Sequence, residues 1–156
     1  MPYKQVSIIT KRYRDRKPPV GSQINWGHPF ARGLVGCWLF NEGGGNRVYD
    51  LSGYGNTGTL TNMTSTASSG WNPGWDGTAL IFDATDDYID CGNKSILNNL
   101  NALTISAWIK ADSWPAVAGI VDKGTSGTED IYDLFYYNGI KVRIKDTLDN
   151  RSEVDG

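Results

Sequence analysis

Side chains that bind hard cations gather in the glycine-rich loops of this chain. Ca²⁺ takes about six to eight oxygen ligands from carboxylates, amides and backbone carbonyls. Asp50 opens the loop Asp-Leu-Ser-Gly-Tyr-Gly-Asn and is the first candidate for a calcium ligand. Weaker candidates by the same chemistry are Glu42, Asn56, Asp86 and Asp87. The alternative is that Asp50 and Asp86 form turns, because a short carboxylate side chain readily accepts hydrogen bonds from the backbone that follows it.

Aromatic side chains beside polar ones suggest a second kind of site. Sugar recognition combines an aromatic face for stacking with polar groups that orient the hydroxyls. Trp108 lies in an alternating segment with Ser106 and Lys110. The other candidates for sugar contact are Tyr132 and Tyr136, which share one face of an expected strand, and Trp71 and Trp75, which could border a groove. A lone Trp on a mixed strand face can instead pack beneath a loop, so both interpretations of Trp108 stay open.

Short strands separated by turns must position these residues. The chain is rich in Gly and aromatic residues, and no long segment has the roughly 3.6-residue period of a helix. We therefore expect an all-β protein with strands at residues 34–40, 48–51, 57–61, 78–82, 88–91, 103–110, 119–122, 130–137 and 140–144. Asn138-Gly139 is the strongest hairpin signal. Residues 71–77 are rich in turn residues, and residues 95–100 can form at most one helical turn.

The net charge of −2 conceals a strong asymmetry. Residues 1–32 carry seven basic residues and one acidic residue, a net charge of +6, whereas residues 33–156 carry eight basic and sixteen acidic residues, a net charge of −8. We expect a basic, Pro-containing arm over residues 1–32 and a folded domain over residues 33–156. Such an arm fits an acidic partner surface or a solvated tail. Its only aromatic residues before Trp26 are Tyr3 and Tyr13, so nucleic acid is not the expected partner.

The sequence shows no targeting or membrane segment. The apolar stretch at residues 7–10 is too short for the core of a signal peptide, and a basic cluster follows it instead of preceding it. No stretch is long and apolar enough to span a bilayer, so we expect no membrane span. Cys37 and Cys91 lack metal-type spacing, and we expect them to be reduced core residues unless the protein is exported by another route.

Three blocks of sequence occur in a recognisable order. The first comprises Gly-Leu-Val-Gly-Cys-Trp-Leu-Phe-Asn-Glu-Gly-Gly-Gly at residues 33–45 and Val-Tyr-Asp-Leu-Ser-Gly-Tyr-Gly-Asn-Thr-Gly-Thr-Leu at residues 48–60. The second comprises Ala-Leu-Ile-Phe-Asp at residues 79–83 and Asp-Tyr-Ile-Asp at residues 87–90. The third is Leu-Thr-Ile-Ser-Ala-Trp-Ile-Lys at residues 103–110. In this order and spacing, the blocks resemble the laminin G-like jelly-roll domains of the concanavalin A-like family.

The resemblance covers residues 33 to about 144 and implies an antiparallel two-sheet jelly-roll sandwich with one concave face. It also implies carbohydrate or protein binding, often with a structural calcium ion near the loops. Such domains occur in phage and metagenomic virion-associated proteins, a setting that the basic arm fits. Two departures stand out: Ala84 replaces the usual Gly, and the chain ends before the closing strands of the family. We therefore expect an incomplete, N-terminal portion of the sandwich, which further sequence, an oligomer or a partner chain completes.

Catalysis is not expected. Glucanases of this fold place their catalytic carboxylates as Glu-x-Asp-x-x-Glu on one strand, where alternate residues share a face. The nearest group here, Glu129-Asp130 with Asp133, does not reproduce that spacing. His28 is the only histidine, which excludes a multi-histidine zinc site within one chain and disfavours a His-based triad. The favoured hypothesis is a non-enzymatic module that recognises carbohydrate, and the alternative is a structural, virion-associated domain for protein–protein assembly.

Overall fold

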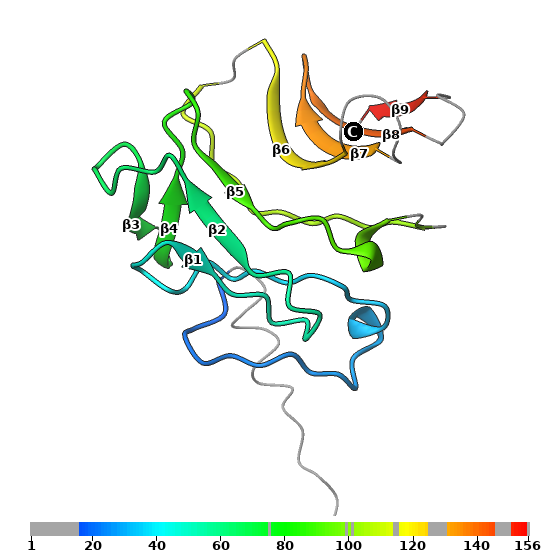
Figure 1. The fold of residues 1–156 in the computed structure, drawn as a ribbon, viewed down its shortest axis with the longest axis horizontal. Helices are drawn as coiled ribbons and strands as arrows, with labels where there is room; N and C mark the ends of the chain where they lie inside the picture. Colours follow the sequence, from blue (N-terminus) through cyan, green and yellow to red (C-terminus); the bar gives the residue numbers. More distant parts are fainter. Residues whose placement is uncertain are drawn as a thin grey trace, which may run out of the picture. The chain divides into compact units, whose positions relative to one another are not determined.

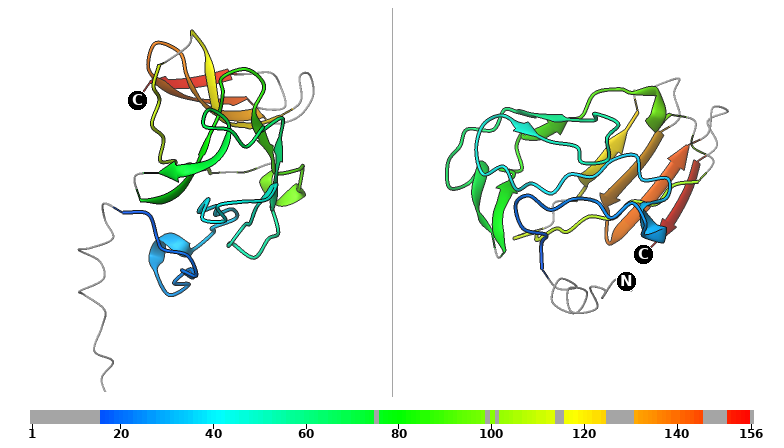
Figure 2. Two further views of the ribbon diagram at one scale, coloured as in Figure 1. Left: turned by 90° about the vertical axis from the view of Figure 1, so that its left-hand side faces the viewer. Right: turned by 90° about the horizontal axis from the view of Figure 1, so that it is seen from below.

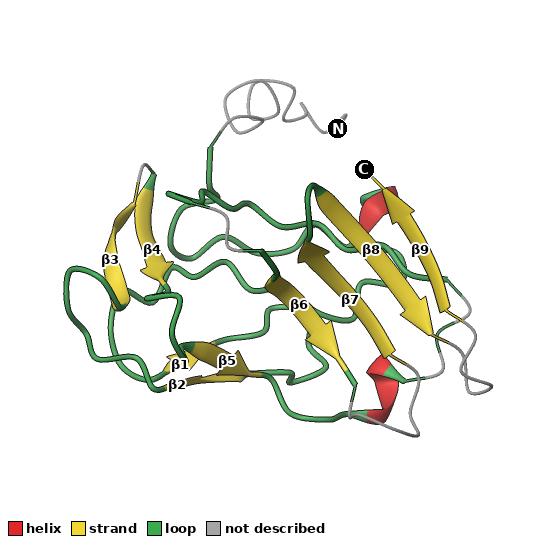
Figure 3. Ribbon diagram, turned by 90° about the horizontal axis from the view of Figure 1, so that it is seen from above, coloured by secondary structure: helices red, strands yellow, loops and turns green. Residues whose placement is uncertain are grey.

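The fold is seen in a computed structural model that describes residues 16–74, 76–98, 100, 102–113, 116–124, 131–145 and 151–155. The chain divides into two compact units, Met1–Leu97 and Asn98–Gly156, and each is described by itself. Within the described residues the structure has nine strands and two 3₁₀ turns, η1 (Pro29–Ala31) and η2 (Ser95–Leu97), but no α-helix (Figures 1 and 3). In this part of the chain no helical segment has the length and apolarity needed to span a bilayer. The prediction of an all-β protein is confirmed.

The first unit contains two small antiparallel sheets. One sheet has three strands in the order β1 (Arg47–Val48), β2 (Gly58–Thr61) and β5 (Tyr88–Asp90). The other is a hairpin of β3 (Gly70–Gly74) and β4 (Gly77–Ile81), drawn in two shades of green in Figure 1. Val48 on β1 is fully buried and is the largest apolar side chain that solvent does not reach in this part of the chain.

The strands β4 and β5 flank the turn at residues 83–87 and belong to different sheets, because β5 pairs with β2. Two expectations for the first unit were wrong. Residues 71–74 lie in the strand β3 and not in a turn. Residues 34–40 form no strand; Trp38 makes only an isolated bridge to Asp50, and Phe40 has a φ of 53°, which ends the extended conformation.

The second unit contains a four-stranded meander. Its strands are β6 (Ala118–Lys123), β7 (Ile131–Tyr136), β8 (Ile140–Lys145) and β9 (Arg151–Asp155), which lie side by side in Figure 2. The Asn138-Gly139 hairpin prediction is confirmed, since both residues have positive φ and the strands on either side pair from Tyr136 and Ile140 outward. A β-bulge interrupts β6 between Gly119 and Val121.

The predicted strand at residues 103–110 is absent. The expected alternation holds from Leu103 to Ser106, where half-buried and exposed residues alternate, and it is lost from Ala107 onward. Alternation favours an extended backbone, but a strand also needs a hydrogen-bonded neighbour. In the part of the chain that the structure describes, this segment pairs with no other strand.

Replacing Gly58 with Ala is expected to destabilise the first unit by about 1–3 kcal/mol, the usual range for overpacking. A Cβ atom at Gly58 would lie 2.4 Å from Ile89 Cγ2 and 2.7 Å from Val48 Cγ2. Val48 is fully buried and has no room to turn away. Chemical denaturation measures the loss. Gly44→Ala is the matched control, because a Cβ there meets nothing within 4 Å; an equal effect of the two substitutions would contradict the packing account.

Candidate functional site

Asp50 lies two residues after the end of β1 and organises the loop that follows it. Its Oδ1 accepts hydrogen bonds from the backbone N–H groups of Cys37 (3.0 Å) and Ser52 (2.9 Å). Its Oδ2 accepts from the Ser52 hydroxyl (2.7 Å) and from the Asn56 N–H (2.9 Å). Four donors therefore occupy the two carboxylate oxygens. This arrangement matches the turn-forming role that the sequence left open beside calcium ligation.

The electrostatics of Asp50 follow from these bonds. Partial burial raises the pKa of its carboxyl, but the hydrogen bonds from Ser52, Asn56 and Cys37 outweigh burial, so the pKa lies below its usual value. The carboxylate is consequently ionised at neutral pH. Its four hydrogen bonds are charge-assisted, which makes them stronger than bonds between neutral groups.

Asn56 extends the same network into the interior. The residue is fully buried, and its Nδ2 donates to the Val35 carbonyl at 2.7 Å. The backbone carbonyl of Asn56 accepts a hydrogen bond from Trp38 Nε1, also at 2.7 Å. Its Oδ1 is buried and has no hydrogen-bond partner among the described residues. Asn56 and Asp50, both candidate metal ligands from sequence, therefore lie in one network that ties the loop to residues 35–38.

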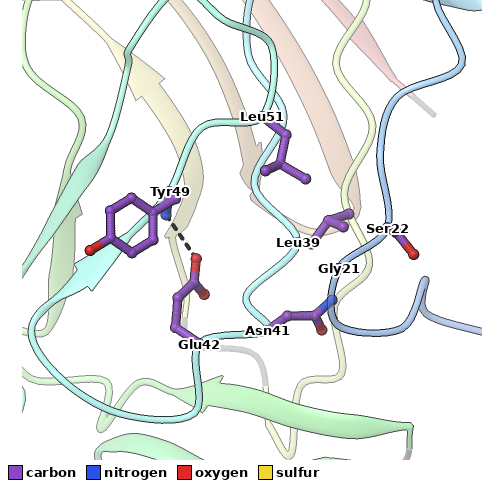
Figure 4. Close-up of a pocket in the computed structure, with 7 residues that line it drawn as sticks. All are labelled: Gly21, Ser22, Leu39, Asn41, Glu42, Tyr49 and Leu51. Carbon is purple, nitrogen blue, oxygen red and sulfur yellow. Dashed lines mark hydrogen bonds between the residues drawn. The ribbon is translucent and has the colours of Figure 1, made fainter.

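Glu42 borders a shallow depression of about 120 Å³, shown in Figure 4. Its Oε1 accepts a hydrogen bond from the Tyr49 N–H at 2.8 Å, and its Oε2 is buried without a hydrogen-bond partner in the described part of the chain. Gly21 and Ser22, from the region expected to be an arm, form one wall of the depression. Ligand pockets usually enclose about 300–1,000 Å³, so this depression is small for a ligand of drug size.

Asp83, Asp86 and Asp87 form the described cluster best suited to a metal ion. Their carboxylate oxygens lie within 4.8 Å of one another. The Asp83 N–H donates to Asp87 Oδ2 at 2.9 Å, and the Thr85 N–H donates to Asp83 Oδ1 at 2.8 Å. Ala84 has a φ of 62°, a conformation that Gly adopts more easily, where the resemblance expects Gly. Asp83 was missed as a candidate ligand, although its place at the start of the same acidic turn was a usable signal.

The tryptophan candidates lie in different environments. Trp108 is 86% exposed, so it does not pack beneath a loop in this structure. Trp71 on β3 is half-buried, and its Nε1 donates to the Gly45 carbonyl at 2.9 Å. Trp75 lies outside the described residues. Trp71 and Trp108, the two candidates within the described residues, belong to different units of the chain.

Tyr132 and Tyr136 share one face of β7, as expected from their spacing. Both are half-buried, and Leu134 lies between them on the same face. Their partners on β8 are Ile144 and Ile140. Burial raises the pKa of Tyr132. The two tyrosines thus belong to a mainly apolar face of the meander.

The opposite face of the meander carries a row of charges that sequence reasoning missed. Asp122 on β6 pairs with Asp133 on β7, which pairs with Arg143 on β8. Asp133 is 2% exposed, and Arg143 binds both of its carboxylate oxygens. The guanidinium also lies over the Phe135 ring, 4.7 Å from its centroid. Burial raises the pKa of Asp122, Asp133 adds to the rise, and Arg143 opposes it.

Cys37 and Cys91 are half-buried, free thiols. Burial, together with the charge of Asp50, raises the pKa of Cys37. Burial, with smaller effects of Asp90 and Asp50, raises the pKa of Cys91 to about 11. Both thiols are therefore protonated at neutral pH, the form with low reactivity.

Comparisons with family models, with curated proteins and with solved structures found no significant match to this chain.

Proposed function

We propose that this chain is a non-enzymatic binding module that recognises carbohydrate on a concanavalin A-like jelly-roll framework. The antiparallel all-β architecture supports that framework, together with the three ordered sequence blocks. The observation that carries the function is Trp108, whose indole is 86% exposed. Ser106 and Lys110 are also exposed and lie two residues before and two residues after Trp108, so they supply polar groups on the same segment. An aromatic face with adjacent hydrogen-bonding groups is the combination that stacks and orients a sugar.

The engaged carboxylates of Asp50 and Asp133 are in keeping with a binding role without catalysis. Hydrolysis of a glycosidic bond needs two carboxyl groups that both reach the substrate. Arg143 engages both oxygens of Asp133, and four donors engage those of Asp50. Asp122 is exposed, but its cross-strand neighbour Asp133 is not.

Trp108→Ala is expected to weaken glycan binding roughly tenfold or more, because a stacked indole contributes through both its buried area and its ring contact. A glycan array identifies the ligand, and titration then measures the affinity of each variant. Trp26→Ala is the matched control, since Trp26 is also exposed, at 56%, but lies in the N-terminal region. Absence of glycan binding by the folded protein, or wild-type affinity of the Trp108 variant, would refute the proposal.

A second candidate function is protein–protein assembly, as in a structural component of a virion. It is favoured by three exposed apolar side chains in residues 16–32: Val20 at 81%, Trp26 at 56% and Phe30 at 88%. Contiguous exposed apolar patches mark interaction sites, and these three side chains lie within eleven residues of one segment. Replacing all three with Ser distinguishes the functions, because assembly would be lost while glycan binding would remain.

We also propose that Ca²⁺ binds at Asp83, Asp86 and Asp87, where three carboxylates converge. At about a hundredfold excess over Kd, a bound ion adds roughly 2.7 kcal/mol of stability. Millimolar Ca²⁺ is therefore expected to raise the Tm of the wild type but not that of the Asp86→Asn/Asp87→Asn variant. Asp90→Asn, an exposed carboxylate outside the turn, is the control. A wild-type Tm indifferent to chelator and to added Ca²⁺ would count against the site.

A further inference from the structure

Lys17 is held by two backbone carbonyls from distant parts of the first unit. Its Nζ donates to the Phe40 carbonyl and to the Thr78 carbonyl, each at 2.5 Å. The Thr78 hydroxyl donates to the same Phe40 carbonyl at 3.1 Å. The backbone beside Lys17 is also fixed, because Asn41 Nδ2 donates to the Pro18 carbonyl at 2.8 Å. The ammonium group is therefore a specifically bound cation and not part of a solvated tail.

Two carboxylates act on this ammonium without contacting it. Burial lowers the pKa of Lys17, and the charges of Glu42 and Asp76 oppose that change. Glu42 Oε2 and Asp76 Oδ2 are both buried, and neither has a hydrogen-bond partner in the described part of the chain. No ion pair joins either carboxylate to Lys17 among these residues. Buried carboxylate oxygens without partners are costly, and an ion or a water molecule is the usual explanation.

We propose that Phe40, Thr78, Glu42 and Asp76 form a cation site in which the Lys17 ammonium is the resident cation and for which Ca²⁺ competes. The Phe40 and Thr78 carbonyls bind the ammonium directly, and the buried carboxylate oxygens of Glu42 and Asp76 lie two residues along the chain from Phe40 and Thr78. The two segments are adjacent, since a Cβ at Gly43 would lie 3.1 Å from Thr78 Cγ2. Carbonyl and carboxylate oxygens are the hard donors that Ca²⁺ takes from protein. Two carboxylates carry a charge of −2, which one ammonium neutralises only by half. A divalent ion neutralises it fully, and water can supply the remaining ligands. The site shares no residue with the acidic turn at residues 83–87.

Exchange of Lys17 for Ca²⁺ would release the N-terminal segment. Residues 17 and 18 supply the contacts that attach this segment to Phe40, Asn41 and Thr78. Gly21 and Ser22, a few residues further on, form one wall of the depression beside Glu42. The same exchange would therefore open that wall, so the cation content of the site would control both the attachment of the segment and the shape of the depression.

The test uses Lys17→Met, which keeps the aliphatic stem and removes the charge. It is made in the Asp86→Asn/Asp87→Asn background, so that the outcome is independent of the proposed calcium site in the acidic turn. Without Ca²⁺ the Tm should fall, and millimolar Ca²⁺ should raise it by about 5 °C or more, a shift that the parent lacks. Adding Glu42→Gln should abolish that rise. Lys94→Met is the matched control, because Lys94 Nζ donates to a single backbone carbonyl, that of Tyr54, at 3.1 Å.

A folded Lys17→Met variant whose Tm responds to Ca²⁺ no more than its parent overturns the proposal. Should the variant not fold, the same parent retains Lys17 and allows a second measurement. Competition predicts that Ca²⁺ frees the amine, so acetylation of Lys17 by acetic anhydride should become at least about threefold faster at millimolar Ca²⁺. Mass spectrometry measures this rate, with Lys94 as the internal reference. A rate ratio of Lys17 to Lys94 that Ca²⁺ leaves unchanged also overturns the proposal.

Discussion

Replacing Asp50 with Ala is expected to lower the free energy of unfolding by about 3 kcal/mol or more, measured by chemical denaturation at neutral pH. The carboxylate accepts four hydrogen bonds, three from backbone N–H groups and one from the Ser52 hydroxyl. Bonds to a charged acceptor each contribute about 1.5–3 kcal/mol, and their effects are not additive. Alanine leaves the partly buried donors without an acceptor, and the loop after β1 loses its attachment to Cys37.

The control and the pH dependence make this prediction specific. Asp90→Ala removes an exposed carboxylate that accepts one backbone N–H, from Gly92 at 2.8 Å, and should cost about 1 kcal/mol or less. The folded pKa of Asp50 is depressed, so its stabilisation is present above the unfolded value of about 3.9 and is lost as the pH falls through the folded pKa. The Asp50→Ala variant should therefore lose less stability than the wild type on acidification below about pH 4. Equal losses from the two substitutions would contradict the central role of Asp50.

Replacing Arg143 with Met is expected to destabilise the meander by about 3–5 kcal/mol, the range for breaking one side of a buried ion pair. The Asp133 side chain is 4% exposed, and Arg143 Nε donates to its two oxygens at 3.2 and 3.1 Å, with Nη2 adding a further bond. Without the guanidinium, the carboxylate is left buried with its charge uncompensated. Methionine keeps an unbranched apolar stem at this position, so the loss is expected to report mainly on the charge.

A double-mutant cycle separates this charge effect from lost packing. Arg143→Met combined with Asp133→Asn should recover about 1–3 kcal/mol relative to Arg143→Met alone, because the second substitution removes the stranded charge. Arg47→Met replaces an exposed arginine on β1 and serves as the control for removing a guanidinium. If the double variant is no more stable than the single one, the ion pair does not explain the loss.

Turn chemistry predicted more of the fold than strand patterning did. Asn138-Gly139 located the hairpin of β7 and β8, because few residues other than Asn and Gly tolerate positive φ at adjacent positions. The alternating segment at residues 103–110, by contrast, did not become a strand. The partner of β5 was also missed, since a period of two residues indicates which face is covered and not which strand lies alongside. The pairing of β5 with β2 depends on contacts distant in sequence.

The candidate site, like the fold, was predicted only in part from the sequence. The sequence identified Asp50 but could not choose between metal ligand and turn former, because the choice depends on which donors converge on its oxygens. The pair of Asp133 and Arg143 was out of reach, because counting outward from a two-residue Asn138-Gly139 turn places Asp133 opposite Ile144. The observed loop also includes Tyr137, and this extra residue brings Arg143 opposite Asp133. Asp122 was out of reach for a similar reason, because the bulge in β6 shifts its register by one residue.

That bulge makes the two edges of the meander unequal. The sheet runs in the order β6-β7-β8-β9, so β6 and β9 are its outer strands. The extra residue in β6, Ile120, breaks the regular spacing of free N–H and carbonyl groups that an incoming strand would need. No register shift interrupts β9, from Arg151 to Asp155. A strand that extends this sheet, from further sequence or from another chain, is therefore expected to pair with β9. The sheet is then extended at the β9 edge and not at the β6 edge.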